Sequence, residues 1–127
     1  MRLYSIEYTE YGEQTYKWSL DELTLININL IVGKNAVGKS RILRIINSVA
    51  RLIEGSILPS SMTTGQYKTV FKDLSHTSKK SRPTKPDITY EIEVHNNKVK
   101  NEMLKIGDVV RLNRKSEGRG SIYFEEE

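Results

Sequence analysis

The segment Gly33–Ser40, with the sequence Gly-Lys-Asn-Ala-Val-Gly-Lys-Ser, constrains this chain more than any other stretch. It fits the pattern G-x-x-x-x-G-K-[ST] at every required position, and that pattern is typical of a phosphate-binding loop between a strand and a helix. The apolar, β-branched run Leu23–Val32 precedes it and predicts a buried strand. The residues after it predict a helix over Lys39–Glu54, with one apolar face. That face carries Ile42, Ile45, Ile46, Val49 and Ile53.

The residue types of this loop suit a phosphate chain. Gly33 and Gly38 tolerate positive φ and let backbone N–H groups approach phosphate oxygens closely. The start of the helix favours an anion, Lys39 supplies a mobile charge for the β- and γ-phosphates, and the Ser40 hydroxyl suits Mg²⁺. The alternative is a chance glycine turn before a helix, with Lys39 and Ser40 only solvated. We expect a nucleoside triphosphate to bind here.

Length and composition favour a single domain covering residues 1–127. This length is small for a complete ATPase with a phosphate-binding loop. Without cysteine, the chain has neither disulfides nor thiolate metal sites and gives no sign of secretion. No signal peptide or membrane-spanning run is evident, so a cytoplasmic location and no membrane partner are expected. The net charge of +4 is mild. It could attract nucleic acid, but many soluble domains carry as much.

The N-terminal segment predicts a hairpin. Arg2–Tyr8 alternates as a strand does, and Gln14–Trp18 could return as its partner across a turn. Tyr16 or Trp18 could stack on a nucleobase, because aromatic faces do so readily. Both rings could equally pack within the sheet, since spacing alone does not orient them.

The second half predicts a loop followed by antiparallel strands. Residues 74–87 are polar, basic and interrupted by two prolines, which predicts a flexible loop. Its basic side chains could contact a phosphate backbone or simply be solvated. They are Lys79, Lys80, Arg82 and Lys85. A β-meander is then expected, with strands at Ile88–Val94, Val99–Ile106, Val109–Asn113 and Ser121–Glu125.

The loop has Asn35 at its third position and follows Ile-Asn-Leu-Ile-Val. In this it resembles the N-terminal lobe of ABC-type ATPases of the chromosome-maintenance, RecF-like and overcoming-lysogenization-defect kinds. It also resembles bacterial AAA-family ATP-binding proteins of anti-phage defence. The resemblance implies an α/β fold: a P-loop NTPase lobe whose mixed sheet includes the P-loop strand, with one long P-loop helix. The antiparallel meander would form a second layer.

The resemblance also implies a set of ATP and Mg²⁺ contacts. Ser40 would bind Mg²⁺, and the backbone N–H of Arg41 would reach the α-phosphate. The contacts carried over from the motif are Gly33, Lys34, Asn35, Ala36, Val37, Gly38, Lys39, Ser40 and Arg41.

Three segments that such ATPases need are not evident: a signature of the Ser-Gly-Gly type, a Walker B strand ending in Asp-Glu, and a switch histidine. Ser121–Glu126 imitates Walker B poorly, so Glu125 and Glu126 are weak candidates, and Gln66 stays unassigned. No catalytic residue is assigned. The chain is expected to be the first lobe of a larger ATPase, hydrolysing ATP only when missing segments or a partner complete it.

Two functional hypotheses follow. The first is a nucleotide-gated switch in DNA repair or phage defence, whose partners would be a second copy, the remaining half of the ATPase, an effector nuclease or toxin subunit, or nucleic acid. The second is a non-catalytic assembly module built on the same fold. A GTPase or small kinase fits less well. Asn97–Lys100 lacks the Asp of Asn-Lys-x-Asp, and only the loop at Arg82 could serve as a kinase lid.

Overall fold

The computed structural model describes residues 1–11, 18–26, 29, 38–73, 85–115 and 119–124. Within them lie one α-helix, one short 3₁₀ helix and seven β-strands. The helices are α1 (Lys39–Glu54) and η1 (Pro59–Ser61). The strands are β1 (Arg2–Glu10), β2 (Ser19–Thr24), β3 (Gly65–Lys72), β4 (Ile88–His95), β5 (Lys98–Ile106), β6 (Val109–Arg114) and β7 (Gly120–Ile122).

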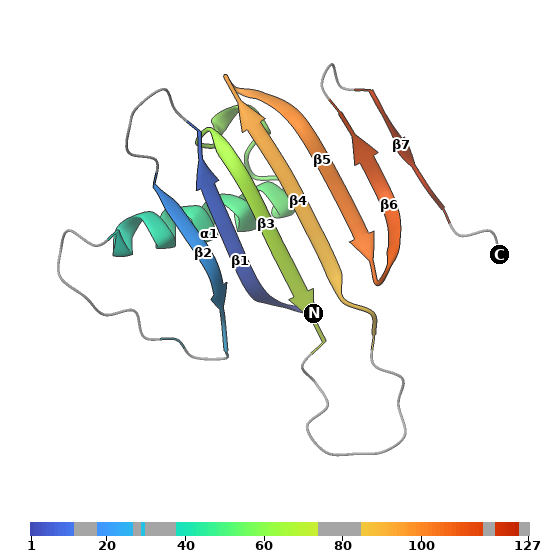
Figure 1. Ribbon diagram of the computed structural model, residues 1–127, viewed down its shortest axis with the longest axis horizontal. Helices are drawn as coiled ribbons and strands as arrows, with labels where there is room; N and C mark the ends of the chain where they lie inside the picture. Colours follow the sequence, from blue (N-terminus) through green and yellow to red (C-terminus); the bar gives the residue numbers. More distant parts are fainter. Residues whose placement is uncertain (12–17, 27–28, 30–37, 74–84, 116–118, 125–127) are drawn as a thin grey trace, which may run out of the picture.

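All seven strands belong to one antiparallel sheet, in the order β2-β1-β3-β4-β5-β6-β7 (Figure 1). Five consecutive strands, β3 to β7, follow one another as a meander. The N-terminal hairpin joins that meander because β1 pairs with β3 along its length, from Arg2 opposite Lys72 to Glu10 opposite Gly65. Asn96 and Asn97 make the tight turn between β4 and β5 with positive φ, a conformation that asparagine tolerates.

Helix α1 crosses one face of this sheet behind β1 and β3 (Figure 1). Alternate residues of the strands point toward it, since side chains alternate between the two faces of a strand. Ile45 and Val49 of α1 are buried against them. The buried apolar core consists of Ile6, Tyr8, Ile45, Val49, Met62, Tyr67, Ile92 and Val94.

The expected helix boundaries are confirmed at both ends. The helix begins at Lys39 and ends at Glu54, where Gly55 adopts the left-handed conformation with φ 85°. The N–H of Gly55 donates to the carbonyl of Leu52, and the N–H of Ser56 donates to that of Arg51. These two bonds satisfy carbonyl groups that the helix end would otherwise leave unpaired. The predicted apolar face is only partly covered, because Ile53 is more than half exposed.

The expected fold class, a mixed α/β P-loop NTPase lobe, is wrong. The described strands form one antiparallel sheet with one helix, a mostly β arrangement, whereas that class needs parallel strands and several helices. The meander does not form a second layer either. It continues the sheet of the N-terminal hairpin, because β3 pairs with β1 on one side and with β4 on the other.

Of the strand expected over Leu23–Val32, only Leu23 and Thr24 lie in a described strand, and residues 25, 26 and 29 do not. Strand β2 starts earlier, at Ser19, and ends at Thr24. Just beyond it, the side chain of Asn29 accepts the N–H of Ile26 at 2.9 Å and donates to the Ile26 carbonyl at 2.7 Å. An asparagine side chain that binds nearby backbone groups competes with a strand ladder. Ile26, beyond the end of β2, is 71% exposed.

Candidate functional site

The described part of the glycine-rich motif lies where α1 begins. Gly38 immediately precedes the helix, and Lys39, Ser40 and Arg41 form its first turn. The other motif residues, Gly33–Val37, lie outside the described residues. The structure therefore brings together the last four of the nine expected contacts and leaves the first five untested.

Gly38 adopts a backbone conformation that other residues rarely take. Its φ is 87° and its ψ is 17°, in the left-handed region. A Cβ atom at this position would also lie 3.1 Å from Nε1 of Trp18, a tight contact. Backbone conformation and limited space both favour glycine here, independently of any ligand.

The first turn of α1 is suited to an anion. The first helical bond runs from the N–H of Ile42 to the carbonyl of Gly38, at 3.0 Å. The earlier N–H groups of a helix have no carbonyl partner within it, and the helix dipole adds partial positive charge at this end. Among the described residues, no side chain caps this end, and the first turn of α1 contains no acidic residue.

Trp18 and Arg41 form a wall beside this helix end. The guanidinium carbon of Arg41 lies 5.1 Å from the centroid of the Trp18 ring, within the range of a cation–π contact. The Nη2 of Arg41 lies 3.5 Å from Oε1 of Glu10. Glu10 is in turn fixed to the hairpin, because its N–H donates to the Trp18 carbonyl at 3.0 Å. The wall thus joins β1, the residue before β2 and α1.

A cavity of about 230 Å³ lies next to this wall. Its lining residues are Tyr8, Glu10, Trp18, Arg41, Arg44, Ile45 and Thr63. The centroids of the Tyr8 and Trp18 rings lie 5.8 Å apart. The Tyr8 hydroxyl donates to the Thr64 carbonyl at 2.8 Å. Burial raises the pKa of Tyr8 above its usual value, so this hydroxyl keeps its proton to a higher pH than an exposed tyrosine does. The cavity combines aromatic surface with one carboxylate and two guanidinium groups.

Sequence patterns identified Trp18 and Arg41 but missed Glu10, Arg44 and Tyr8 as their neighbours. Pairing across the N-terminal hairpin could have placed Glu10 beside Trp18, had the return strand been placed correctly. Arg44 follows Arg41 by one helical turn, a spacing at which side chains share a helix face.

Several other candidates cannot be placed. Tyr16, Lys79, Lys80, Arg82, Glu125 and Glu126 lie outside the described residues. Lys85 is described and exposed, in the irregular segment before β4. Gln66 lies in β3 and accepts a hydrogen bond from the Tyr11 hydroxyl at 3.3 Å. It is far in sequence from the first turn of α1, and no role is assigned to it. Across the described ranges, no group of three or more His, Cys, Asp or Glu side chains could hold a metal ion.

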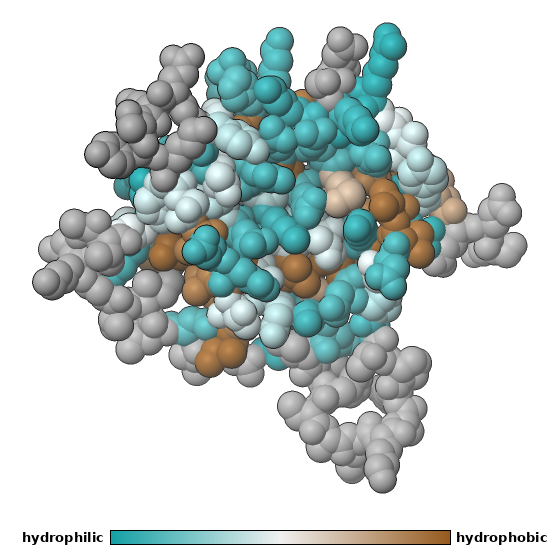
Figure 2. Space-filling model, in the orientation of Figure 1, coloured by the Kyte–Doolittle hydropathy of each residue, from teal (hydrophilic) through white to brown (hydrophobic). Residues whose placement is uncertain are grey.

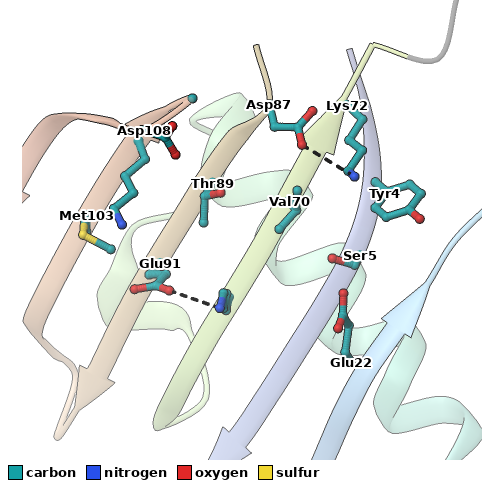
Figure 3. Close-up of a pocket in the computed structure, with 13 residues that line it drawn as sticks. Tyr4, Ser5, Glu22, Val70, Lys72, Asp87, Thr89, Glu91, Met103 and Asp108 are labelled. Atoms are coloured by element: carbon teal, nitrogen blue, oxygen red, sulfur yellow. Dashed lines mark ion pairs between the residues drawn. The ribbon is translucent and has the colours of Figure 1, made fainter.

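A second hollow, of about 400 Å³, lies on the sheet face opposite α1 (Figure 3). Two ion pairs lie among its lining residues: Lys72 with Asp87 at 3.5 Å, and Lys68 with Glu91 at 3.7 Å. Figure 2 shows that this face is mostly hydrophilic. It therefore resembles an ordinary solvated sheet face more than a binding site.

Comparison with known proteins identifies no relative. No protein-family model, no curated protein and no solved structure matches this chain. In the part of the chain that the structure describes, no helix is long and apolar enough to cross a membrane.

Proposed function

We propose that this chain binds Mg·ATP at the start of α1, with the phosphates held by Gly33–Ser40. The observation that carries the proposal is the left-handed Gly38 immediately before a helix that begins at Lys39, at the motif positions where a phosphate loop needs both. The resemblance to ATP-binding lobes no longer supports it through the fold. The support is now local: the motif and the helix end.

Each described motif residue has a role that its place supports. The backbone N–H groups of the first turn would donate hydrogen bonds to phosphate oxygens, which that end of a helix favours. The ammonium group of Lys39 would contact the β- and γ-phosphates as a mobile charge. Arg41 would contribute its backbone N–H, while its guanidinium stays on Trp18 and Glu10.

Magnesium fits this arrangement only together with the phosphates. Ser40 is exposed as the second residue of α1, so its hydroxyl is open to an ion. The cation usually takes one or two protein ligands, substrate phosphates and water in such sites. When bound, Mg²⁺ would neutralise phosphate charge. Hydrolysis is not part of the proposal, because the sequence motifs assign no residue to activate water.

The consequence for function is a nucleotide-gated switch rather than a self-sufficient enzyme. ATP at the start of α1 would lie beside the Trp18–Arg41 wall, which connects the helix to the N-terminal hairpin. Occupancy could thus bias how the hairpin and helix are held together. The proposed role of this switch in DNA repair or phage defence rests only on the resemblance.

The test is direct binding of Mg·ATP to the purified chain, measured by equilibrium dialysis and by fluorescence. The chain has a single tryptophan, Trp18, whose ring contacts Gly38 and Arg41. Its emission should therefore change as ATP binds. Mg·GTP is measured beside Mg·ATP.

We expect Lys39→Ala to weaken binding by about tenfold or more, the usual range for one charge-assisted contact. The matched control is Lys98→Ala, which removes an exposed lysine at the start of β5 and should leave binding unchanged. Circular dichroism checks that both variants are folded. The proposal fails when the wild-type chain shows no ATP binding, or when both lysine variants lose it equally.

A further inference from the structure

The outer strand β7 combines an unpaired strand edge with exposed apolar side chains. It lies at one edge of the sheet, beside β6 only. Ile122 is 63% exposed and Phe124, just beyond the strand, is 84% exposed. Tyr123 between them is half-exposed. An uncovered apolar edge strand is a template for pairing with another chain, and proteins usually blunt such edges with charge or proline.

The hydrogen bonds to β6 show which backbone groups of this edge are open. The N–H of Tyr123 donates to the Arg111 carbonyl at 2.7 Å, and the N–H of Lys115 donates to the Arg119 carbonyl at 3.0 Å. Residues that bond to the neighbouring strand alternate with residues whose N–H and C=O point away. Gly120, Ile122 and Phe124 therefore direct their backbone groups outward.

We propose that β7 pairs antiparallel with β7 of a second copy, about a two-fold axis at Ile122. This register uses all three outward residues: Ile122 meets its own mate, and Gly120 meets Phe124 in both directions. About six backbone hydrogen bonds result, two for each directly opposed pair of this type. An identical strand supplies both halves of the pattern, which is what a two-fold interface requires.

The side chains fit the same register. A Cβ at Gly120 would clash with the Asn113 carbonyl oxygen, so this position on the edge carries no side chain. The mate's Phe124 ring would cover the bare backbone there, as aromatic rings do for edge glycines. Bare glycine and exposed phenylalanine are thus complementary across the axis.

The apolar surface behind β7 extends the interface. Leu104 pairs with Leu112, and Leu112 pairs with Ile122, so the three side chains share one face of the sheet. That face has a groove of about 470 Å³, lined by Leu104, Ile106, Arg111, Leu112, Ile122, Tyr123 and Phe124. Figure 1 shows that α1 does not extend behind β6 and β7. A two-fold axis perpendicular to the sheet would join this apolar row to its copy.

The size of the interface favours a weak, reversible dimer. Two copies of Ile122, Tyr123 and Phe124 would bury on the order of 1,000 Å² in total, the lower end for specific association. The other edge of the sheet is protected, because β2 exposes Asp21 and Glu22. Two β2 strands side by side would bring like charges together.

The test uses the full chain without nucleotide, so that it does not depend on the proposed ATP site. Sedimentation velocity over a range of concentrations should show a monomer–dimer equilibrium. Ile122→Lys should weaken the dimer by about tenfold or more, because two lysines would then face each other at the axis. Ile122→Glu should do the same. The matched control is Ile26→Lys, at an exposed isoleucine of the opposite edge region, which should leave the dimer intact.

The decisive arm mixes the two charged variants. A lysine copy and a glutamate copy place opposite charges at the axis, so the mixture should form a heterodimer that neither variant forms alone. The proposal is overturned when the wild-type chain stays monomeric, when Ile122→Lys remains a dimer, or when mixing restores nothing. Species that grow beyond a dimer would also overturn it, since they would indicate open-ended pairing of unlike edges.

Discussion

Gly38 is the residue at which backbone geometry and the proposed site meet. It holds φ 87° directly before α1, and the Trp18 indole lies against it. Gly55 at the other end of α1 holds nearly the same φ of 85°, but nothing lies within 4 Å of where its Cβ would be. Comparing substitutions at the two glycines therefore distinguishes the cost of backbone strain from the cost of a clash with Trp18.

Alanine at each of these glycines should give different results. Gly55→Ala should cost about 1 kcal/mol of unfolding free energy, from the left-handed backbone alone. Gly38→Ala should cost about 1 kcal/mol more, because its methyl group must displace the Trp18 ring. Urea denaturation followed by circular dichroism measures both. Trp18 emission should shift for Gly38→Ala only, and equal costs with unchanged emission would contradict the contact.

Among the elements, β4, β5 and β6 are tied together by a polar cluster of Tyr90, Glu102 and Arg114. The Tyr90 hydroxyl donates to Oε1 of Glu102 at 2.7 Å, and Nη2 of Arg114 lies 2.6 Å from its Oε2. The Glu102 side chain is only 14% exposed. One carboxylate thus accepts from both neighbouring strands, and burial raises the pKa of Tyr90.

Glu102→Gln should lower the free energy of unfolding by about 1–3 kcal/mol, because it removes the charge that Arg114 pairs with inside the sheet. The control is Glu91→Gln, which removes a longer, more exposed pair with Lys68 at 3.7 Å. That change should cost less than about 1 kcal/mol. Thermal and urea unfolding of the two variants give the comparison. Similar costs would mean that the cluster adds nothing beyond an ordinary surface pair.

The elements also show which sequence patterns were sufficient. The helix was predictable because an apolar period, a preceding Gly38 and a following Gly55 all agree on its bounds. The meander strands were recognisable from alternation and from the Asn96-Asn97 turn. The bounds of strand β2 differ from the expected ones because the apolar run extends past Thr24, whereas the backbone of Ile26 bonds to the Asn29 side chain beyond the end of the strand.

The overall arrangement was not predictable in the same way, because it depends on pairing between distant segments. Nothing local in β1 or β3 shows that Tyr8 lies opposite Tyr67, and that pairing makes one sheet out of two expected layers. The candidate site likewise combines residues predictable from a local motif with residues that only the fold brings near. The motif gave Lys39, Ser40 and Arg41, whereas Glu10 reaches Arg41 only through the fold.

For the whole molecule, the core places tyrosine hydroxyls where ionisation is unfavourable. Burial raises the pKa of Tyr67 from 10.0 to about 12, and its hydroxyl donates to the Thr63 carbonyl at 2.8 Å. A raised pKa means that the folded protein holds a proton which the unfolded chain has released. This contribution to stability is complete below pH 10 and is lost as the pH rises toward about 12.

The free energy of unfolding should therefore fall steeply between pH 10 and about pH 12. Tyr67→Phe should cost about 1 kcal/mol at neutral pH, from the lost hydrogen bond, but should flatten this alkaline decline. Phe71→Leu is the control, since it destabilises the sheet without removing an ionisable group and should keep the full slope. Urea titrations at several pH values test this. Equal slopes for the Tyr67→Phe variant and the wild type would contradict the assignment.

The place of β1 between β2 and β3 has a consequence for protein synthesis. On the ribosome, β1, β2 and α1 are translated before β3, so one side of β1 has no partner strand and α1 lacks the core side chains of β3 and β4 when they emerge. In the meander from β3 onward, each strand pairs with the next strand in the sequence, so these strands can pair as they are synthesised. Closure of β3 onto β1 is therefore the long-range step, and a nascent chain stalled before Gly65 would be a natural substrate for chaperones.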